Sequence, residues 1–416
     1  MRRPGPARRP PRESSHAVTI RVALLLPPAA LLALLWSGAA GAHDPSAWGG
    51  LFRSRDDGAR WLPVTAGRFI GGALGLAISP VDPHHLLLGT DSGLLRSRNG
   101  GRDWTAEAPG VMVGAVFSAA FDADGVKALA ATADGLFRSE DGVTWRRTSL
   151  SRAALPARAF LRGGGAGHVY LAGANGIWRS DDWGASWANG SDGLPEGPVV
   201  AASALPDAPE TLYVVAGRRL WTRNGPARRW EPSDTGMPEG RVDTVSRGAG
   251  AAAPLWAFAA DQLYRSDDRG RRWRPVGGAL PERNTAVRGI AVGPGSIVLT
   301  TDRGLLRSTN DGHTWELQEG VLPVHLEAGP LVRDPAEPDT LYAGFALTPY
   351  EEMWRMAVEG GSLLDRLDAL SLAGGAAFLL VIALVAGVTL RRLGRHYRQP
   401  GATANWRSPR IDGSVR

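Results

Sequence analysis

The stretch Ser180-Asp-Asp-Trp-Gly-Ala-Ser-Trp187 carries a pattern, Ser-x-Asp-x-Gly-x-x-Trp, that returns along most of this 416-residue chain. The last tryptophan of each copy stands at position 61, 104, 145, 187, 230, 273 or 315, so neighbouring copies are 41 to 43 residues apart. Such a period indicates a repeat architecture, in which each repeat is one supersecondary unit packed on its neighbours.

The seven copies differ in how completely they keep the pattern. Asn replaces Asp in two copies, the copy that begins at Ser139 is one residue short, and the copy from Arg223 to Trp230 keeps only the length and the tryptophan. The residues predicted to build these turns are Ser54, Asp56, Gly58, Trp61, Ser97, Asn99, Gly101, Trp104, Ser139, Asp141, Trp145, Ser180, Asp182, Gly184, Trp187, Trp230, Ser266, Asp268, Gly270, Trp273, Ser308, Asn310, Gly312 and Trp315.

Each residue type in the pattern has a physical role in a β-hairpin. The alternation of apolar and polar residues before a copy, as at 51–54, is typical of a strand. The Asp or Asn side chain can accept hydrogen bonds from backbone N–H groups two residues on, and the Gly supplies a positive φ. The Trp begins the next strand and offers a large apolar face for burial. The motif is the Asp box, and repeats that carry it resemble those of the BNR-repeat β-propellers.

The strands between the boxes predict an all-β, seven-bladed β-propeller over residues 43–346. A full repeat has two apolar strands before its box, as at 199–206 and 211–217. The first box lacks such a pair, and a pair at 329–335 and 340–345 has no box after it. We therefore expect the N-terminal half-blade to complete the C-terminal one, with strands near Leu51 and Leu341 in one sheet. That arrangement closes the ring and removes its sheet edges.

Proline-rich turns at 79–83, 205–209 and 334–338 precede apolar strands. Together with the Asp boxes, they make residues 48–345 resemble the photosystem II stability and assembly factor family and, more distantly, sortilin-type and sialidase-type propellers. The resemblance implies an exported binding protein that helps to build a membrane complex. This chain departs from that family pattern at its C-terminal end.

The two ends of the chain are basic and the middle is mildly acidic. Residues 1–42 carry six arginines and one glutamate, residues 391–416 carry seven arginines and one aspartate, and residues 43–368 have a net charge of −5. The acidic middle argues against a body that binds nucleic acid. Residues 1–42 combine arginines, a 15-residue apolar run at 22–36 and Ala40-Gly-Ala42, which predicts a signal peptide; an uncleaved anchor is the alternative.

Residues 369–390 form a run of 22 residues without a charge, which predicts one C-terminal transmembrane helix after a connector at 347–368. Arginines follow the run at once, so the positive-inside rule places a basic tail, 391–416, in the cytoplasm. The propeller would then lie on the periplasmic or other extracytoplasmic side of a bacterial-type inner membrane.

A sialidase-like activity is the first enzyme hypothesis. Sialidases need an arginine cluster and a Tyr–Glu nucleophile pair, but their Arg-Ile-Pro signature is missing. Tyr170, Tyr213 and Tyr342 occupy equivalent repeat positions and are interpreted as strand residues. Tyr350-Glu-Glu352 is the remaining Tyr beside acidic residues, and we expect it on a solvated face of the connector.

Another glycoside hydrolase is the second enzyme hypothesis, which would require two carboxylates facing a cleft. Asp122 and Asp124 follow an apolar strand, but they fit an ordinary Asp-x-Asp-Gly turn equally well. The chain has no cysteine, and His84-His85 is its one adjacent histidine pair, so we expect no metal and no cofactor.

Arginines supply the candidate binding site. Arg162, Arg247, Arg288 and Arg333 stand near the ends of the predicted innermost strands, which could place four guanidinium groups at one mouth of the axial channel. Arginine suits bidentate capture of carboxylates. Scattered surface arginines in an arginine-rich chain are the alternative.

These observations favour a non-catalytic scaffold that binds a protein or peptide partner at the membrane during assembly of a complex. A carbohydrate-active enzyme on the same scaffold is the competing hypothesis. A receptor that signals through the helix is a third, but the predicted cytoplasmic tail is short for an output domain.

Overall fold

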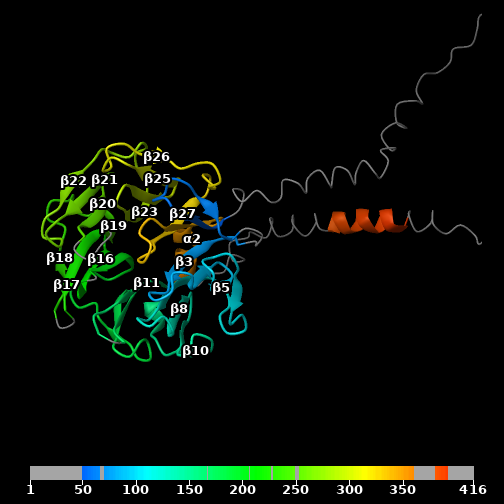
Figure 1. Cartoon of the computed structure of the whole chain (residues 1–416). Helices are drawn as coiled ribbons and strands as arrows, with labels where there is room; N and C mark the ends of the chain where they lie inside the picture. Colours follow the sequence, from blue (N-terminus) through cyan, green and yellow to red (C-terminus); the bar gives the residue numbers. More distant parts are fainter. Residues whose placement is uncertain are drawn as a thin grey trace, which may run out of the picture. The chain divides into compact units, whose positions relative to one another are not determined.

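A computed structural model describes residues 49–65, 70–165, 167–205, 207–225, 228–248, 253–359 and 380–391. Within these residues, seven four-stranded antiparallel sheets surround a common axis, as Figure 1 shows. The predicted seven-bladed β-propeller is therefore confirmed. The predicted signal peptide, 1–42, and the tail after Arg391 lie outside the described residues.

Each blade is a meander of four strands, numbered outward from the axis. The innermost strands are β3 (Ala73–Ile78), β7 (Val116–Phe121), β11 (Ala157–Arg162), β15 (Val199–Leu205), β19 (Val242–Arg247), β23 (Val287–Val292) and β27 (Glu327–Arg333). The second strands are β4 (Leu86–Thr90), β8 (Ala128–Thr132), β12 (Val169–Gly173), β16 (Ala208–Ala216), β20 (Leu255–Ala259), β24 (Ile297–Thr301) and β28 (Leu341–Ala346).

The outer half of each blade contains the strands that flank an Asp box. The third strands are β5 (Gly93–Ser97), β9 (Leu136–Ser139), β13 (Gly176–Ser180), β17 (Arg219–Asn224), β21 (Gln262–Ser266), β25 (Gly304–Ser308) and β1 (Gly50–Ser54). The outermost strands are β6 (Thr105–Glu107), β10 (Trp145–Thr148), β14 (Ala188–Asn189), β18 (Glu231–Pro232), β22 (Arg274–Val276), β26 (Glu316–Leu317) and β2 (Leu62–Pro63). We number the blades 1 to 7 in the order of their innermost strands, so blade 7 contains β27, β28, β1 and β2.

The second strands form the core because both of their faces pack against neighbouring blades. Every residue of β4, β8, β12, β20, β24 and β28 is buried. The innermost strands approach one another more closely. A Cβ at Gly75 of β3 would lie 2.6 Å from the carbonyl oxygen of Phe117 in β7, so only glycine fits there. Successive innermost strands contact one another, and β27 contacts β3, which completes the ring.

Ring closure joins the two ends of the propeller in one sheet. β1 pairs antiparallel with β28, with Leu51 opposite Gly344 and Ser54 opposite Leu341. The prediction that the N-terminal half-blade completes the C-terminal one is therefore confirmed. The pairing uses backbone groups of β28 that would otherwise form a free sheet edge.

The complete Asp boxes share one hydrogen-bond pattern. In the box after β13, Ser180 Oγ accepts from the Gly184 N–H at 2.7 Å and donates to Asp182 at 2.8 Å. Asp182 Oδ1 accepts from the Ser186 N–H at 2.8 Å, four residues on, whereas the sequence predicted an N–H two residues on. Gly184 has φ +81°, as predicted. The serine hydroxyl and the Asp carboxylate together close a turn that is wider than the one predicted for the Asp alone.

The incomplete boxes follow different rules. In the short box, Asp141 accepts from the N–H groups of Val143 and Thr144, two and three residues on. In the degenerate box, Arg223 stands at the serine position; its guanidinium lies over the rings of Tyr170 and Trp230 and donates to Gly190 O at 3.1 Å. A buried arginine between two rings therefore replaces the serine staple.

The predicted burial of the box tryptophans holds for six of the seven. Trp187 is half-buried, and Trp183 inside the same box is the buried ring. Trp104 is 2% exposed, and its Nε1 donates to Val64 O at 2.9 Å and to Gly101 O at 3.1 Å.

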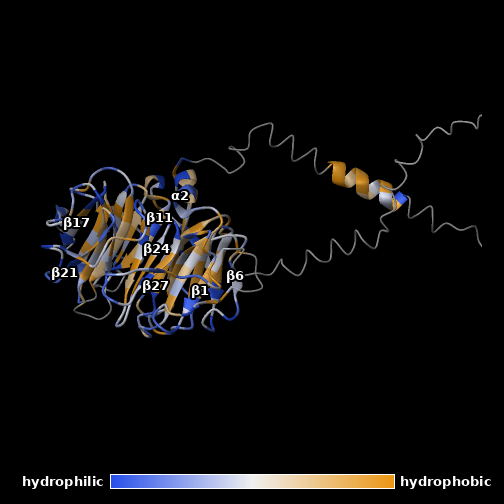
Figure 2. Cartoon of the chain, turned by 90° about the horizontal axis from the view of Figure 1, so that it is seen from above, coloured by the Kyte–Doolittle hydropathy of each residue, from blue (hydrophilic) through white to orange (hydrophobic). Residues whose placement is uncertain are grey.

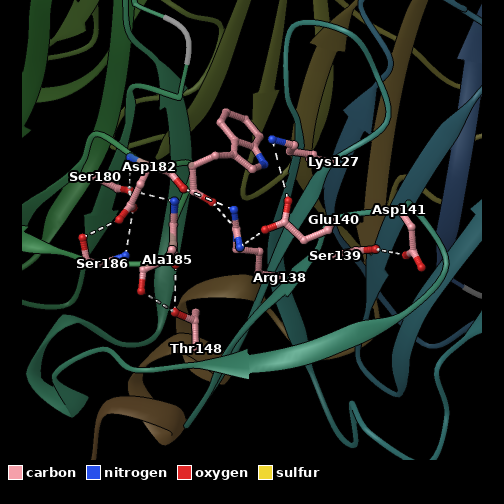
Figure 3. A network of polar contacts seen from close by, with 12 residues as sticks. Lys127, Arg138, Ser139, Glu140, Asp141, Thr148, Ser180, Asp182, Ala185 and Ser186 are labelled. Carbon is pink, nitrogen blue, oxygen red and sulfur yellow. Dashed lines mark hydrogen bonds and ion pairs between the residues drawn. The ribbon is translucent and has the colours of Figure 1, made fainter.

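The boxes also join neighbouring blades. Arg138 of blade 2 donates through Nε to Trp183 O of blade 3 at 2.6 Å, and Thr148 donates to Gly184 O at 2.8 Å; Figure 3 shows this junction. Arg53 donates in the same way to Gly100 O at 2.6 Å, from blade 7 to blade 1. The carbonyl that accepts from Arg138 or Arg53 belongs to the residue just before the box glycine, so one turn closes a hairpin and contacts the preceding blade.

Two helices follow the ring. α2 (Tyr350–Glu359) packs against the propeller, and residues 380–391 form a helix in a separate compact unit, 359–416. A 3-10 turn, η2 (Arg152–Ala154), precedes β11. Among the described residues, no helix is long and apolar enough to cross a membrane. The described part of the predicted span is the apolar helix in Figure 2.

Candidate functional site

A cavity of about 570 Å³ lies on the propeller axis. All seven innermost strands line it, and so do Tyr350 and Glu351 of α2. A volume of this size lies within the usual range for ligand-binding cavities. The innermost strands are arranged around the axis and all run along it in the same direction, as the parallel bridge between Gly248 and Val292 illustrates. The axis therefore has one mouth where these strands begin and another where they end.

Helix α2 covers the mouth where the innermost strands begin. Arg158, the second residue of β11, donates to the two carboxylate oxygens of Glu351 at 2.7 and 3.0 Å. Its guanidinium carbon lies 5.0 Å from the ring centroid of Tyr350 and 4.5 Å from that of Trp354. Phe117 of β7 meets both rings edge to face. A bidentate ion pair and two cation–π contacts hold α2 at this position.

A second arginine extends the ion-pair network. Arg288, the second residue of β23, lies 2.9 Å from Glu327 and 3.7 Å from Glu351. Burial raises the pKa of Glu327, although Arg288 acts in the opposite direction. Burial also acts to raise the pKa of Glu351, but the hydrogen bonds and charge of Arg158 outweigh it and leave that pKa below its ordinary value. Glu351 is therefore held as a carboxylate between two guanidinium groups.

The segment 350–352 is not the solvated face that the sequence predicted. Tyr350 is 8% exposed, and burial raises its pKa. Tyr350 and Trp354 are four residues apart on one face of α2, and their rings stack 6.1 Å apart. The repeat pattern ends before this segment, so only a helical Tyr-x-x-x-Trp spacing could have indicated the buried face. Arg158 was not predicted, because it stands near the start of β11 and the predicted site was at the strand ends.

The structure divides the four predicted arginines between the two mouths. Arg162, Arg247 and Arg333 are the last residues of their strands, whereas Arg288 is near the start of its strand. The expected ring of four guanidinium groups at one mouth is therefore not formed. Arg288 belongs to the α2 mouth, where Arg158 accompanies it.

The three arginines at the strand ends differ in their surroundings. Arg333 lies 2.8 Å from Asp57, and both side chains are almost buried. Arg162 is exposed. Arg247 is half-buried, and its guanidinium donates a long hydrogen bond of 3.5 Å to Gly248 O. Within the described ranges, neither Arg162 nor Arg247 has a carboxylate partner. Burial lowers the pKa of Arg247.

A Tyr–Glu pair does occur, but away from the axis. Tyr170 of β12 donates to Glu210 at 2.5 Å, and His168 approaches the same carboxylate at 3.2 Å. Tyr170 is fully buried and does not line the axial cavity. Burial and the neighbouring Glu210 raise the pKa of Tyr170 to about 12, which opposes a role as a nucleophile.

The aspartates of the other enzyme hypothesis lie in one turn. Asp122 and Asp124 both accept from the Val126 N–H, at 3.1 and 3.0 Å. Burial and the neighbouring Asp124 raise the pKa of Asp122 to about 6. Neither side chain lines the axial cavity, where the carboxylates are those of Asp243 and Glu351. Each of these two has an arginine partner, Arg218 for Asp243 and Arg158 for Glu351. Among the described residues, the axial cavity therefore has no two unpaired carboxylates that face each other.

Seven four-stranded blades, stapled by Asp boxes around a lined axial cavity, define an Asp-box β-propeller. Its fold resembles solved structures of YCF48, as the sequence predicted. YCF48 from Cyanidioschyzon merolae aligns at 16% identity over 67% of this chain and 96% of its own length, with a TM-score of 0.51. YCF48 bound to D1 peptide aligns at 19% identity over 67% and 93% of the two chains, also with a TM-score of 0.51.

An enzyme also shares the fold. The GH74 xyloglucanase from Xanthomonas campestris aligns at 18% identity with a TM-score of 0.54, over 67% of this chain but only 51% of the enzyme. Comparisons with protein-family models and with curated proteins give no match. At these identities the structural likenesses establish the fold alone.

Proposed function

We propose that this protein is a non-catalytic scaffold that captures a carboxylate-bearing protein or peptide partner at the mouth where the innermost strands end. Its work would be to hold that partner during assembly of a membrane complex. The observation that carries the proposal is Arg247, a half-buried guanidinium without a carboxylate partner in the described part of the chain. A buried charge is costly unless it is paired, so a bound carboxylate would relieve that cost.

Two further observations support this proposal. Arg162 stands at the corresponding end of β11 and is exposed, so a second guanidinium is free to contribute. YCF48, a propeller of the same fold, has been solved bound to D1 peptide. The likeness supplies the kind of ligand to test, and the arginines of this chain supply the chemistry.

Membrane attachment is part of the proposal. Residues 380–390 form the described part of the uncharged run 369–390, and seven of their aliphatic side chains are exposed: Leu380, Val381, Ile382, Leu384, Val385, Val388 and Leu390. A soluble surface rarely exposes such a continuous apolar set. We propose that the run spans the inner membrane with the propeller on the extracytoplasmic side, after export directed by residues 1–42.

Arginine substitutions test the capture site. The variant Arg162→Ala/Arg247→Ala should capture less of the partner from detergent-solubilised membranes, and peptides from the captured partner then allow its Kd to be measured. Loss of one charged hydrogen bond costs about 1.5–3 kcal/mol, so each substitution should weaken binding by about 10- to 100-fold. The melting temperature should change little, because a half-exposed, unpaired arginine contributes little to folding.

Arg102→Ala is the matched control, because Arg102 is an exposed arginine in the Asp box after β5 and does not stand at the end of an innermost strand. This variant should capture the partner as the unmodified chain does. Equal capture by the double variant and the control would show that the partner does not use the arginines at the strand ends.

A further inference from the structure

Helix α2 is an addition to a ring that is already complete. The last propeller strand, β28, ends at Ala346, and its pairing with β1 closes the ring before α2 begins at Tyr350. α2 has ten residues, and a helix of this length is marginal in water when isolated. Its helical state therefore depends on the surface beneath it.

The contacts between α2 and the ring are concentrated in three side chains. Tyr350 and Trp354 enclose the guanidinium of Arg158, and Glu351 accepts both of its hydrogen bonds. An apolar cluster that includes Leu74 and Phe117 adds to this contact. Arg158 therefore binds a carboxylate that is flanked by two aromatic rings, on a surface of apolar residues. This contact is made by side chains and not by pairing of the backbone.

One carboxylate of the ion-pair network at this mouth comes from α2. The network joins two guanidinium groups, Arg158 and Arg288, to two carboxylates, Glu327 and Glu351. Glu351 belongs to α2, so the departure of α2 would remove the carboxylate partner of Arg158 in this network and uncover the apolar residues beneath the helix. A surface of that kind attracts another carboxylate flanked by aromatic rings.

We infer that Arg158 and Arg288 form a second carboxylate-binding site of the propeller, and that α2 is its built-in, displaceable ligand. The external partner that fits is a helical peptide segment with an acidic residue between aromatic residues, spaced as in Tyr350-Glu-x-x-Trp354. The site is at the opposite mouth from Arg247, so it is independent of the proposed capture of a partner there. Because α2 is part of the chain, its effective concentration is about millimolar, and an external segment must compete with it.

A peptide supplied in trans tests the inference in the full chain. The probe is a fluorescent synthetic peptide with the sequence of residues 347–359. The variant Glu351→Gln/Trp354→Ala should release α2 and bind the probe at least about tenfold more tightly than the unmodified chain does, because internal competition is removed. Adding Arg158→Gln to this variant should abolish the gain, and a probe with Gln at the position of Glu351 should bind weakly to every form.

No gain in probe affinity on release of α2, or a gain that survives Arg158→Gln, would overturn the inference. Gel filtration is run in parallel, since a dimer of the release variant would mean that α2 exchanges between copies instead of receiving a partner. If the release variant does not fold, an experiment on the unmodified chain still tests the inference. A millimolar excess of a probe with Gln at the position of Arg355, which trypsin does not cleave, should raise the rate of tryptic cleavage after the exposed Arg355 of the chain at least about threefold, and an unchanged rate counts against the inference.

Discussion

Arg333 and Asp57 form an ion pair between the last residue of β27 and the first Asp box, with Nη2 and Oδ1 2.8 Å apart and side chains that are only 11% and 12% exposed. Asp57 also accepts from the Gly295 N–H at 3.1 Å, and its carbonyl accepts from Ser296 at 2.7 Å. The carboxylate therefore connects blade 7 to blade 6 at the place where the ring closes.

This pair predicts that Arg333 is structural, in contrast to its expected role in binding. Arg333→Ala should lower the free energy of unfolding by about 3–5 kcal/mol, because it leaves the Asp57 charge buried and unpaired. Asp57→Asn should cost a similar amount. A double-mutant cycle measured by chemical denaturation checks the prediction, and additive effects of the two substitutions would show that the pair contributes nothing of its own.

The box tryptophans should differ in their contribution to stability. Trp104→Ala removes a ring that is 2% exposed and should cost about 3–5 kcal/mol of unfolding free energy. Trp187→Ala should cost clearly less, because that ring is half-buried and Trp183 fills the core of its box. Urea denaturation of the two variants under the same conditions distinguishes them, and equal losses would contradict the burial difference.

The aspartate boxes should make the fold sensitive to acid. Burial acts to raise the pKa of Asp182, but hydrogen bonds from Ser186 and Ser180 outweigh it and lower the pKa from 3.8 to about 2. A lowered pKa stabilises the folded state above the unfolded value, and this contribution is lost as the pH falls from about 4 to about 2. Asp182→Asn, which copies the boxes with Asn99 and Asn310, should be less stable at pH 7 by about 1 kcal/mol after allowance for solvent screening.

The difference between Asp182→Asn and the unmodified chain should narrow between pH 4 and pH 2, as measured by urea denaturation across that range. Asn310→Gln provides a control at a box that has an amide in place of the titratable aspartate. The loss of unfolding free energy in this variant should not vary over the same pH interval. A stability difference that stays constant with pH would show that Asp182 does not stabilise the fold through its charge.

The charge asymmetry around residues 369–390 predicts the topology of the chain. A reporter fused after Arg416 should be active only in the cytoplasm, and protease added outside should reach the propeller, because arginines follow the apolar run at once. Both measurements are made in spheroplasts, with a cytoplasmic marker to verify that the membrane is intact. If external protease does not cleave the propeller, the proposals of export and of assembly at the extracytoplasmic side of the membrane would both be wrong.

The sequence was sufficient for the ring because its signals are local and repeated. The box glycine adopts a positive φ, as Gly184 does. The strands near Leu51 and Leu341 each belong to an incomplete repeat, so they can complete a blade only by pairing with each other. The hydrogen bond from Ser186 could not be read from spacing, since the Asp side chain can reach an N–H two, three or four residues on. The short box also opens with a serine, but its Asp141 accepts from N–H groups two and three residues on, so the length of the box affects which N–H is used.

The site was less predictable because it depends on contacts between distant segments. Arg158 and Glu351 are 193 residues apart, and nothing in the period of the repeats relates them. Arg288 was assigned to the wrong end of its strand because position in a repeat gives the strand but not which mouth the residue faces. The ion pair of Arg333 with Asp57, and the position of Arg247 without a carboxylate partner among the described residues, likewise became visible only in three dimensions.

The pairing of β1 with β28 has a consequence for how the protein is made. A ribosome produces Leu51 nearly 300 residues before Gly344, its partner across the sheet. Throughout most of translation, β1 is a strand with an open edge, and such an edge invites pairing with other chains. Products of premature termination before Leu341 would keep this edge permanently, and these fragments are the ones that chaperones and proteases must remove.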